Sequence, residues 1–337
     1  MSEIHKVIGQ GAYGCIHKSA LKCKNEGIND KDMISKVLRK SYGELELLTN
    51  AKIDEIDKDC NYHLGISVGC DIKNTQINKD AINKCDKGSS IDYENITNNM
   101  LILMKDGGID LEMFALRIQN YEQNHKNREL MKGFWVEVMR LMLGIELFQN
   151  NDFIHHDIKP QNILFNENQM RLNYIDFTLC GSINKFMTHS ANGYLLHPGE
   201  WWSYPPEHKF IDPFVYESHN NSEQDEPMNQ SREIRGFLPY IVFWKDRYIN
   251  DVRFLYKEKL NDYKELVDKC FKTLDIYGLG FSLLFVLDSG RHLIHPILYH
   301  ELSQLFYRMI TPIYYDRIEI EELLSAYQDV LEVNELI

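Results

Sequence analysis

The segment from His155 to Asn162 holds three side chains whose chemistry fits phosphoryl transfer. Asp157 can accept a proton from a hydroxyl group, Lys159 can face a transferring phosphate, and Asn162 can hold a magnesium ion. Apolar residues flank the segment on both sides, as in a loop between two short strands. A polar turn would explain any one of these residues alone, whereas the three at these spacings favour a catalytic loop.

A glycine-rich run near the N-terminus is the second candidate for phosphate chemistry. The run reads Gly9-Gln10-Gly11-Ala12-Tyr13-Gly14-Cys15-Ile16. Glycines let a backbone approach phosphates closely because they have no Cβ. The run alone also fits an ordinary hairpin, or a dinucleotide-binding turn that opens a helix. Alternating residues on both sides, 5–8 and 16–21, predict two strands instead, so we expect a hairpin over a nucleotide.

These motifs, in this order, resemble eukaryotic-type protein kinases. The segment from 155 to 162 is similar to the family's H-R-D-x-x-x-x-N loop in its serine/threonine-kinase form, with His156 in place of Arg. The resemblance implies that Asp157, Lys159 and Asn162 are catalytic and that Asn162 also binds magnesium. It implies that every residue of the glycine-rich run except Cys15 contacts ATP.

In this family a lysine on the third strand pairs with a glutamate on the next helix. Lys36 ends an Ile-Ser-Lys stretch of the V-A-I-K form, so we assign it to the ATP phosphates. Lys22 and Lys24 lie nearer the glycine-rich run, but their polar neighbours predict a loop. Glu46 is the expected partner of the lysine, and Glu44 is the alternative because the phase of the helix stays open.

The apolar run from Met100 to Met104 is followed by Lys105, Asp106 and two glycines. By resemblance this is the fifth strand and the hinge beside adenine. Met104 is then the gatekeeper, and the backbone of Lys105 and Asp106 faces the adenine ring. An apolar strand before a glycine turn would also occur in an unrelated protein.

The motif Asp176-Phe177-Thr178 resembles D-F-G, whose Asp holds the magnesium that bridges the phosphates. The resemblance makes Asp176 a metal ligand together with Asn162. Thr178 replaces the glycine of the motif. A β-branched residue has less conformational freedom than glycine, so we expect this loop to change conformation less readily.

Three later segments complete the resemblance. Tyr204-Pro205-Pro206-Glu207 is similar to A-P-E, and the stretch from Asp275 to Gly280 is similar to the start of the family's long central helix. Arg317 matches the late arginine that pairs with the A-P-E glutamate. We therefore expect a buried ion pair between Glu207 and Arg317.

A narrower resemblance is to serine/threonine kinases of large DNA viruses, the mimivirus-like group. It rests on short segments: 13–18, 21–23, 34–36, 53–57, His156 and 205–207. The abundance of Asn, Lys and Ile agrees with an AT-rich genome.

The resemblance implies an α+β, bilobal kinase-like fold from about Val7 to about Leu331, and 337 residues suffice for two domains. We expect a small β-rich N-terminal lobe over 1–105, with one main helix, and a large, mostly helical lobe over 106–337. Apolar helical spacing before the catalytic loop predicts a core helix. Its apolar positions are Met131, Phe134, Trp135, Val138, Leu141, Met142, Ile145 and Phe148.

Two segments are longer than this fold requires. The first, about 71–99, is polar and predicts an insertion in the small lobe. The second, about 208–272, begins with a polar stretch at 219–227 that predicts a mobile loop. Helical spacing from Phe254 to Phe271 predicts an added helix on the substrate side, which could dock a partner. A tolerated surface insertion is the alternative.

The net charge of −13 argues against nonspecific binding to nucleic acids and anionic membranes. The same charge mildly favours basic substrates, although solubility alone would explain it. The sequence has no apolar N-terminal segment and no apolar run of about 18 residues, so we expect neither a leader nor a membrane span.

The cysteine count is odd, and no C-x-x-C pair occurs. The seven cysteines are at 15, 23, 60, 70, 85, 180 and 270. This favours a reducing, cytoplasmic setting, in a host cell or in a virion. Cys60, Cys70 and Cys85 are too irregularly spaced for a zinc site, so we expect core or loop thiols.

The predicted function is an ATP- and magnesium-dependent protein kinase that transfers the γ-phosphate to serine and threonine hydroxyls of proteins. One alternative is a pseudokinase that binds nucleotide or a partner without turnover. Another is a small-molecule phosphotransferase on the same fold.

His156 stands where the family has the arginine that receives an activation-loop phosphate. A neutral histidine is a poor substitute for that arginine near pH 7. We therefore expect activity without phosphorylation of the activation loop. The candidate acceptors are Thr178, Ser182, Thr188, Ser190 and Tyr194.

Overall fold

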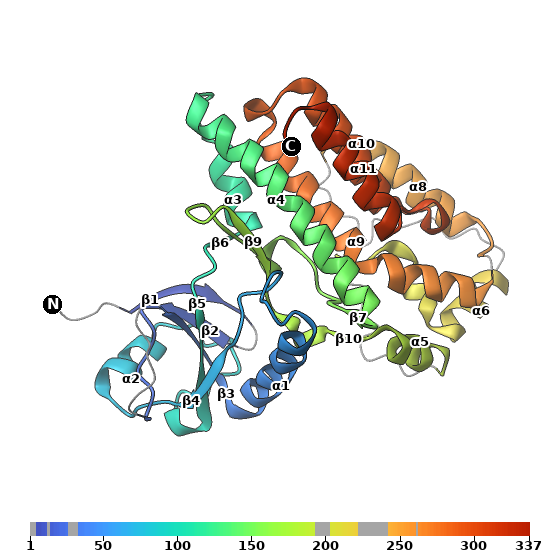
Figure 1. Ribbon diagram of the computed structural model, residues 1–337. Helices are drawn as coiled ribbons and strands as arrows, with labels where there is room; N and C mark the ends of the chain where they lie inside the picture. The colour runs from blue at the N-terminus through green and yellow to red at the C-terminus, as the bar shows by residue number, and fades with distance from the viewer. Residues whose placement is uncertain (1–4, 12–13, 26–32, 193–202, 222–241, 261) are drawn as a thin grey trace. The chain divides into compact units, whose positions relative to one another are not determined.

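The computed structural model of the chain describes residues 5–11, 14–25, 33–192, 203–221, 242–260 and 262–337 (Figure 1). The chain forms two compact units, Met1–Gly107 and Gly108–Ile337. The first unit is built on an antiparallel sheet and the second is mostly helical, so the α+β class is confirmed. The division at Gly107 lies close to the lobe boundary predicted from the sequence.

The described part of the first unit contains a five-stranded antiparallel sheet in the order β1-β2-β3-β5-β4. The strands are β1 (Lys6–Gln10), β2 (Gly14–Lys18), β3 (Met33–Arg39), β4 (Val68–Asp71) and β5 (Asn99–Lys105). The strands predicted on either side of the glycine-rich run are β1 and β2. β5 contains the apolar run from Met100 to Met104, whose first four residues are buried, as expected for an inner strand.

Two helices accompany this sheet. α1 (Lys40–Ile56) follows β3 directly and is the main helix predicted for this unit. α2 (Gln76–Ile82) and the short turn η1 (Ile96–Asn98) lie in the segment predicted as a polar insertion.

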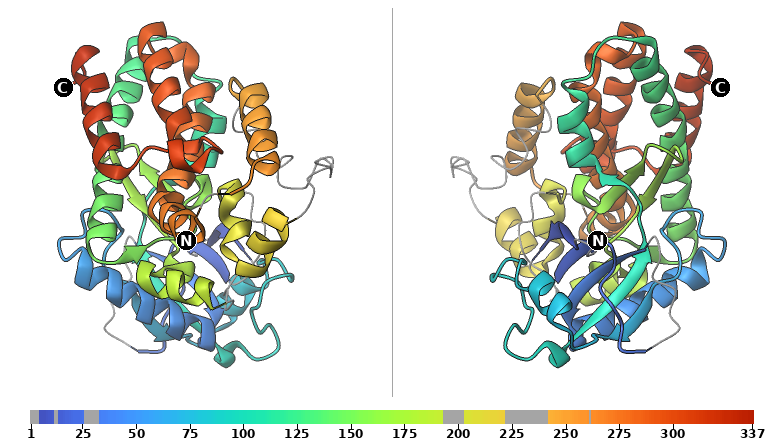
Figure 2. Two further views of the ribbon diagram at one scale, coloured as in Figure 1. Left: turned by 90° about the vertical axis from the view of Figure 1, so that its right-hand side faces the viewer. Right: turned by 90° about the vertical axis from the view of Figure 1, so that its left-hand side faces the viewer.

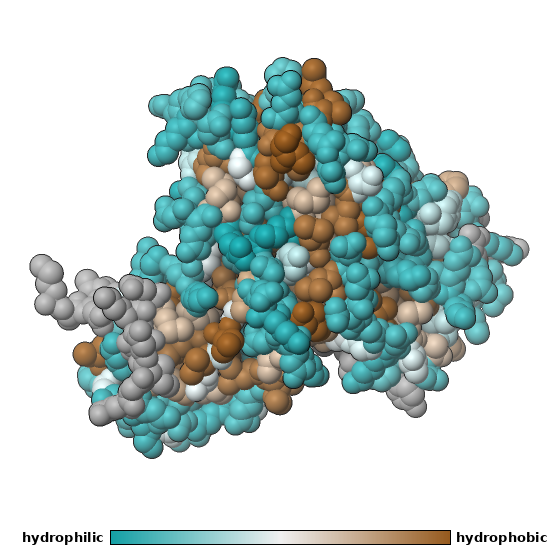
Figure 3. All heavy atoms as spheres, viewed as in Figure 1, coloured by the Kyte–Doolittle hydropathy of each residue, from teal (hydrophilic) through white to brown (hydrophobic). Residues whose placement is uncertain are grey.

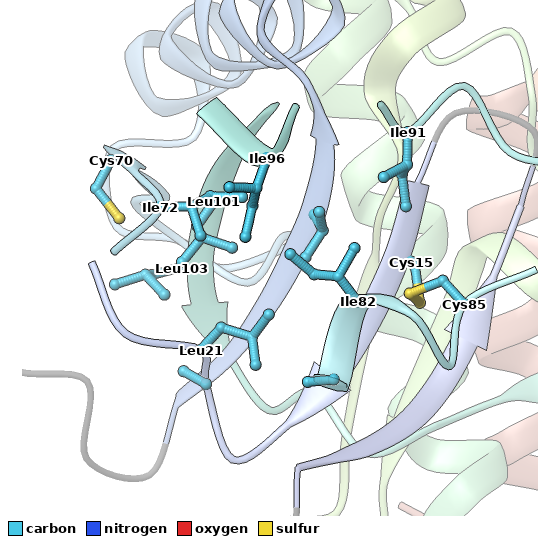
Figure 4. Close-up of a cluster of buried hydrophobic side chains, with 13 residues drawn as sticks. Cys15, Leu21, Cys70, Ile72, Ile82, Cys85, Ile91, Ile96, Leu101 and Leu103 are labelled. Atoms are coloured by element: carbon cyan, nitrogen blue, oxygen red, sulfur yellow. A yellow bond between two sulfur atoms is a disulfide. The ribbon is translucent and has the colours of Figure 1, made fainter. Parts of the chain in front are cut away.

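That prediction of a purely polar insertion was incomplete. Most of its apolar side chains, though not Ile77, are buried in a core cluster with residues of β2 and β5 (Figure 4). They are Ile72, Ala81, Ile82, Cys85, Ile91 and Ile96. Apolar residues spaced between Asn, Asp and Lys pack in this cluster, and most polar residues of the segment stay exposed or partly exposed, although Asn78 and Asn99 are buried. The segment is therefore part of the core of the first unit.

Two disulfides connect the same region. Cys15 of β2 is bonded to Cys85, and Cys23 is bonded to Cys70 of β4. Figure 4 shows the joined sulfurs of the first pair. The prediction that Cys70 and Cys85 are thiols was therefore wrong, because the fold brings each beside a cysteine distant in sequence. The predicted reducing compartment stays a prediction.

The second unit is dominated by long helices, which lie side by side in both views of Figure 2. The described helices are α3 (Leu111–Ile118), α4 (His125–Asn150), α5 (Ile183–Ala191), α6 (Pro213–Asn221), α8 (Lys245–Lys257), α9 (Tyr263–Ser289), α10 (Pro296–Ile310) and α11 (Ile320–Val333). α4 is the predicted core helix, and all eight of its predicted core positions are buried.

α9 is the central helix of this unit, and most of its residues are buried. It begins at Tyr263, well before Asp275, where the sequence motif suggested its start. By length and composition it is the one helix in the described ranges that could cross a membrane, but 94% of its most apolar window is buried inside the protein. That burial is typical of a core helix. On the face drawn in Figure 3 the surface of this unit is largely hydrophilic.

Short strands and turns connect these helices and carry the candidate catalytic residues. The strands are β6 (Ile109–Asp110), β7 (Phe153–Ile154), β8 (Ile163–Asn166), β9 (Arg171–Tyr174) and β10 (Gly181–Ser182). The 3-10 turns are η2 (Pro160–Asn162), η3 (Phe177–Leu179), η4 (Pro206–Ile211), η5 (Arg291–Leu293) and η6 (Tyr314–Asp316). β6, β8 and β9 form one small sheet, and β7 pairs with β10.

Two predictions for the segment 208–272 were inaccurate. Residues 219–221 of the expected loop belong to α6, and 222–227 lie outside the described residues. The helix expected from Phe254 to Phe271 is divided between α8 and α9, since Glu258 ends the first and Asp262 caps the second. Leu255 and Leu260 at this break are buried in the core cluster that includes α9.

Candidate functional site

The glycine-rich run forms the connection between β1 and β2. Gly9 and Gln10 end β1, Gly14 begins β2, and Ala12 and Tyr13 lie outside the described residues. The Gly11 N–H donates to the Gly14 carbonyl at 2.9 Å and closes the turn.

The glycines of this turn differ in the space around them. A Cβ on Gly14 would lie 2.7 Å from the carbonyl oxygen of Val37, so β2 and β3 approach too closely there for a side chain. A Cβ on Gly11 would meet nothing within 4 Å among the described atoms. Gly14 is therefore needed for packing, whereas Gly11 leaves its backbone open to a ligand.

Two further residues of the predicted ATP contacts lie on the same hairpin. The side-chain oxygen of Gln10 accepts a hydrogen bond from the Asp86 N–H, which ties the turn to the segment after α2. Ile16 lies opposite Lys36 in the register of β2 and β3. The hairpin therefore places the glycines and Lys36 in one sheet.

Lys36 and Glu46, predicted as a pair, are in contact. The Lys36 ammonium lies 2.9 Å from one carboxylate oxygen of Glu46 and 2.7 Å from the other. The two side chains are only 14% and 8% exposed. The alternative residues Lys22, Lys24 and Glu44 are exposed. The pairing follows from α1 starting directly after β3, which turns the buried face of the helix toward the strand.

The predicted hinge residues end β5. Met104 is partly buried opposite Ile34 of β3, and Lys105 is exposed. The Asp106 carboxylate lies 2.8 Å from the Lys18 ammonium at the end of β2. The Asp106 side chain therefore ties the end of β5 to the end of β2, and its backbone contact with adenine stays a prediction.

In the second unit, two of the predicted catalytic side chains, Lys159 and Asn162, both contact the third, Asp157. The Lys159 ammonium lies 3.0 and 2.8 Å from the two carboxylate oxygens of Asp157. The amide nitrogen of Asn162 donates to the Asp157 backbone carbonyl and to its carboxylate, both at 2.8 Å. The loop between β7 and β8 thus gathers an acid, a cation and a carboxamide around one carboxylate.

The environment of Asp157 suits a proton acceptor. Burial raises the pKa of its carboxyl above the usual value, while Lys159 and Asn162 act in the opposite direction. A carboxylate whose pKa moves toward neutrality takes up a proton more readily. The side chain is 7% exposed, so it is also largely shielded from water.

Asp275, a buried aspartate on α9, holds the backbone of this loop in place. Asp275 accepts the backbone N–H of His155 at 2.7 Å and of His156 at 2.9 Å. Burial raises the pKa of Asp275 to about 7, against the lowering effect of the two N–H donors. Each carboxylate oxygen therefore holds the backbone N–H of one of the two residues that precede Asp157.

Asp176, the predicted metal ligand, follows β9 in a left-handed backbone conformation with φ of 61°. The Thr178 hydroxyl donates to one oxygen of the Asp176 carboxylate at 2.7 Å. Phe177 between them is buried beside His155, with ring centroids 4.6 Å apart. The threonine that replaces glycine in this motif thus contacts the candidate ligand directly.

Asn162 and Asp176 offer oxygen donors that suit magnesium. Because the amide nitrogen of Asn162 faces Asp157, the amide oxygen points to the other side of the group. Magnesium prefers such hard oxygen ligands and keeps several waters or phosphate oxygens in its shell. By their donor chemistry, the two residues therefore fit a magnesium ion. One carboxylate oxygen of Asp176 also accepts the hydrogen bond from the Thr178 hydroxyl.

His156 lies in an aromatic cluster of the second unit. Its ring is stacked on Tyr204, with centroids 5.1 Å apart and planes 4° from parallel, and it packs against Phe186 at 4.7 Å. The residue is 3% exposed. A phosphate could reach this imidazole only if the cluster opened, which agrees with the expectation that His156 receives no activation-loop phosphate.

The candidate phosphoacceptors are not equivalent. Ser190 is fully buried and donates to the Ile211 carbonyl. The Ser182 hydroxyl donates to Asp152 at 2.5 Å and caps α5. Thr188 lies on α5, and Tyr194 lies outside the described residues. Burial makes Ser190 the least suited of the described acceptors.

The expected ion pair between Glu207 and Arg317 is confirmed. The guanidinium contacts both carboxylate oxygens, at 2.5 and 2.9 Å, and both side chains are fully buried. Arg317 also donates to the Thr273 hydroxyl and to the Thr311 carbonyl. This pair joins η4 to α9 and to the turn before α11.

Sequence reasoning missed two contacts at the candidate site. It named Asp275 only as the start of a helix and Thr178 only as a residue with less conformational freedom than glycine. The Asp275 contact has no local signal, because Asp275 is 120 residues from His155 along the chain. The one available hint was an acidic residue between Leu274 and Ile276 in the apolar part of the helix. Thr178 lies only two residues from Asp176, within reach of a local hydrogen bond that the sequence analysis did not consider.

No protein-family model matches the sequence, and no curated protein matches it significantly.

Proposed function

We propose that the chain is an ATP- and magnesium-dependent protein kinase that phosphorylates serine and threonine hydroxyls of proteins. The observation that carries the proposal is the pair between Lys36 on β3 and Glu46 on the following helix. Protein kinases require this pair to hold the ATP phosphates. In this chain the pair occurs beside a glycine hairpin of the same sheet.

The second unit supports the proposal independently. Asp157 orients the acceptor hydroxyl and takes up its proton as the phosphoryl group is transferred. Lys159 offsets negative charge on that group, and Lys36 holds the other phosphates in place. Catalysis of this kind depends on positioning and electrostatics and needs little covalent chemistry from the protein.

Asn162 and Asp176 would hold the magnesium ion of the reaction. A bound magnesium neutralises charge on the phosphates and aligns them for transfer. The Asp157 carboxylate anchors Asn162 through its amide nitrogen, and this contact keeps the amide oxygen turned away from Asp157.

One observation favours a second candidate function, a nucleotide-binding pseudokinase. The Thr178 hydroxyl donates to Asp176 Oδ1 at 2.7 Å, so this oxygen already has a partner. If the threonine keeps that oxygen from a metal, ATP could bind without transfer. The presence of Lys36, Asp157, Asn162 and Asp176 together favours turnover.

The test is transfer of labelled phosphate from ATP with magnesium to casein, to a basic protein and to the chain itself. Asp157→Ala and Asp176→Asn should abolish transfer to serine and threonine. Lys36→Ala should weaken nucleotide binding, whereas Lys24→Ala, which changes an exposed lysine nearby, is the matched control. Phosphoamino-acid analysis identifies the acceptor hydroxyls.

Three results would contradict the proposal. A folded wild-type protein that binds ATP but transfers nothing, while Thr178→Gly gains transfer, would favour the pseudokinase. Transfer to small alcohols and not to proteins would favour a small-molecule phosphotransferase. A wild-type protein that binds no nucleotide would exclude all three functions.

A further inference from the structure

The loop after α1 carries a second group of side chains with metal-binding chemistry, separate from the residues discussed above. Asp54 lies in the last turn of α1, and Cys60 and His63 follow it before β4. A carboxylate oxygen, a sulfur and a ring nitrogen of these residues all lie within 4.8 Å of one another. Cys60 takes part in neither disulfide. Three different donor types therefore meet at one point of the first unit.

The imidazole of His63 is held in a fixed orientation. Its Nδ1 lies 2.8 Å from Asp57, and its Nε2 lies 2.7 Å from Asp54. Asp57 is in turn fixed by the backbone N–H groups of Asn61 at 2.8 Å and Tyr62 at 2.7 Å. Histidines that bind metals commonly donate their other ring N–H to a carboxylate. The arrangement of Asp57 and His63 has this form.

The group is partly exposed to solvent, mainly at Asp54 and Cys60. The Asp54 side chain is 26% exposed, and Cys60 is half-buried. The side chains of His63 and Asp57 are 6% and 2% exposed. An ion can therefore approach from the side of Asp54. Nδ1 of His63 stays in contact with the buried carboxylate of Asp57.

We propose that Asp54, Cys60 and His63 Nε2 bind one zinc ion, with a water molecule as the fourth ligand. Carboxylate, thiolate and imidazole are the ligands that zinc takes in tetrahedral sites. On binding, the Cys60 thiol and His63 Nε2 each give up any proton they carry to solvent, and Asp57 keeps the proton on Nδ1. The ion ties the last turn of α1, the helix that carries Glu46, to the loop before β4.

The alternative is that these residues serve only as ion pairs. His63 would then bridge Asp54 and Asp57 as a cation, and no metal would bind. The proposal does not depend on the kinase function, because the site is defined by residues of the first unit that take no part in phosphate transfer.

The test uses the full-length protein, stripped with a chelator and titrated with Co²⁺ and then with Zn²⁺. Co²⁺ bound to a thiolate absorbs strongly in the near ultraviolet, and Zn²⁺ should displace it. We expect one equivalent to bind, and Cys60→Ser and His63→Gln to abolish the thiolate band. Asp57→Asn should retain the site but weaken binding about 10- to 100-fold, since it removes the carboxylate behind the imidazole.

Two controls locate the ion. Cys180→Ser changes a thiol of the second unit and should leave binding unchanged. The described residues hold one other group of metal-ligand type, Cys15, His17 and Cys85, whose sulfurs form a disulfide. The double variant Cys15→Ser/Cys85→Ser should also bind one equivalent.

Circular dichroism in chelator shows whether each variant folds. No binding by folded wild-type protein overturns the proposal, as does a thiolate band that survives in folded Cys60→Ser. Loss of the band in the folded Cys15→Ser/Cys85→Ser variant would place the metal at that other group and also overturn it. If Cys60→Ser does not fold, an unchanged affinity in Asp57→Asn overturns the proposal by itself.

Discussion

Arg317 and Glu207 form a two-point ion pair that is fully buried, although 110 residues separate them along the chain. The remaining guanidinium donors are bonded to Thr273 and Thr311. A buried charge keeps this arrangement only while its partner is present, because an unpaired ion in the protein interior is strongly unfavourable.

Removing one member of this pair should destabilise the second unit. We expect Glu207→Gln to lower the free energy of unfolding by about 3–5 kcal/mol, since Arg317 stays charged and buried. The double variant Glu207→Gln/Arg317→Met should recover part of the loss. Urea unfolding followed by fluorescence measures both. Asp268→Asn, which breaks an exposed pair with Lys272, is the control and should change stability by less than about 1 kcal/mol.

The pair between Lys36 and Glu46 leads to a prediction about activity. Glu46→Gln should reduce kcat/KM for ATP about tenfold or more, since a hydrogen bond between charged groups contributes about 1.5–3 kcal/mol. Glu44→Gln changes an exposed carboxylate of the same helix and should have little effect. Steady-state kinetics with varied ATP distinguishes them. Equal losses in both variants would show that Glu46 has no special role.

The two described glycines of the turn between β1 and β2 should respond differently to alanine. Gly14→Ala places a methyl group 2.7 Å from the Val37 carbonyl and should cost about 1–3 kcal/mol of stability. Gly11→Ala meets open space and should change stability by less than about 0.5 kcal/mol. Gly11→Ala should nevertheless raise the Kd for ATP, since its Cβ occupies space that phosphates need. Thermal unfolding and nucleotide titration test the two effects, and an unchanged Kd would place the phosphates elsewhere.

Acid should destabilise the second unit through His208. Burial, together with the smaller effect of His156, lowers the pKa of this imidazole to about 3 in the folded protein. The unfolded chain takes up the proton at about pH 6.5, so the stabilisation is present above pH 6.5 and is lost as the pH falls toward 3. Each pH unit in this window should cost up to about 1.4 kcal/mol.

His208→Phe keeps a ring beside Tyr204 and should reduce this acid sensitivity. Urea unfolding between about pH 8 and pH 4 gives the slope of stability against pH. His125→Gln, which changes a histidine whose side chain is 91% exposed, is the control and should leave the slope unchanged. A slope in His208→Phe equal to that of the wild type would show that His208 does not cause the acid sensitivity.

The disulfides should stabilise the first unit. Cys15 and Cys85 close a loop of 70 residues, and Cys23 and Cys70 close one of 47. We expect Cys15→Ser/Cys85→Ser to lower the free energy of unfolding by about 2–4 kcal/mol under non-reducing conditions. Addition of a dithiol, which reduces both bonds, should lower wild-type stability by more than this. Thiol counting after denaturation shows whether the bonds form, and seven reactive thiols would mean that they do not.

Much of the fold and of the candidate site could be predicted because the signals are local. Lys36 was assigned from the resemblance of its strand to the V-A-I-K motif, and Glu46 was expected on the following helix, with Glu44 left as the alternative because the phase of the helix stayed open. The burial of α4 followed from the spacing of residues such as Phe134 and Leu141. Asp157, Lys159 and Asn162 lie within six residues of one another, so one loop suffices to bring them together.

The remaining features depend on contacts between distant segments. Nothing near Cys15 indicates Cys85 as its partner, since the pairing depends on how the segment after α2 covers the sheet. The break between α8 and α9 was hidden because apolar spacing continues across Leu260, which is buried even though it lies outside both helices. The cluster of Asp54, Asp57 and His63 required the turn after α1, which the sequence pattern does not define.

The contact of Asp275 with the backbone of His155 and His156 has a consequence for the order of folding. The two peptide groups before Asp157 are held by a helix that comes more than a hundred residues later in the chain. During synthesis, the candidate catalytic loop therefore leaves the ribosome well before its support exists. A chain truncated before α9 would lack this anchor, so the backbone before Asp157 should reach its final conformation only once α9 has packed against it.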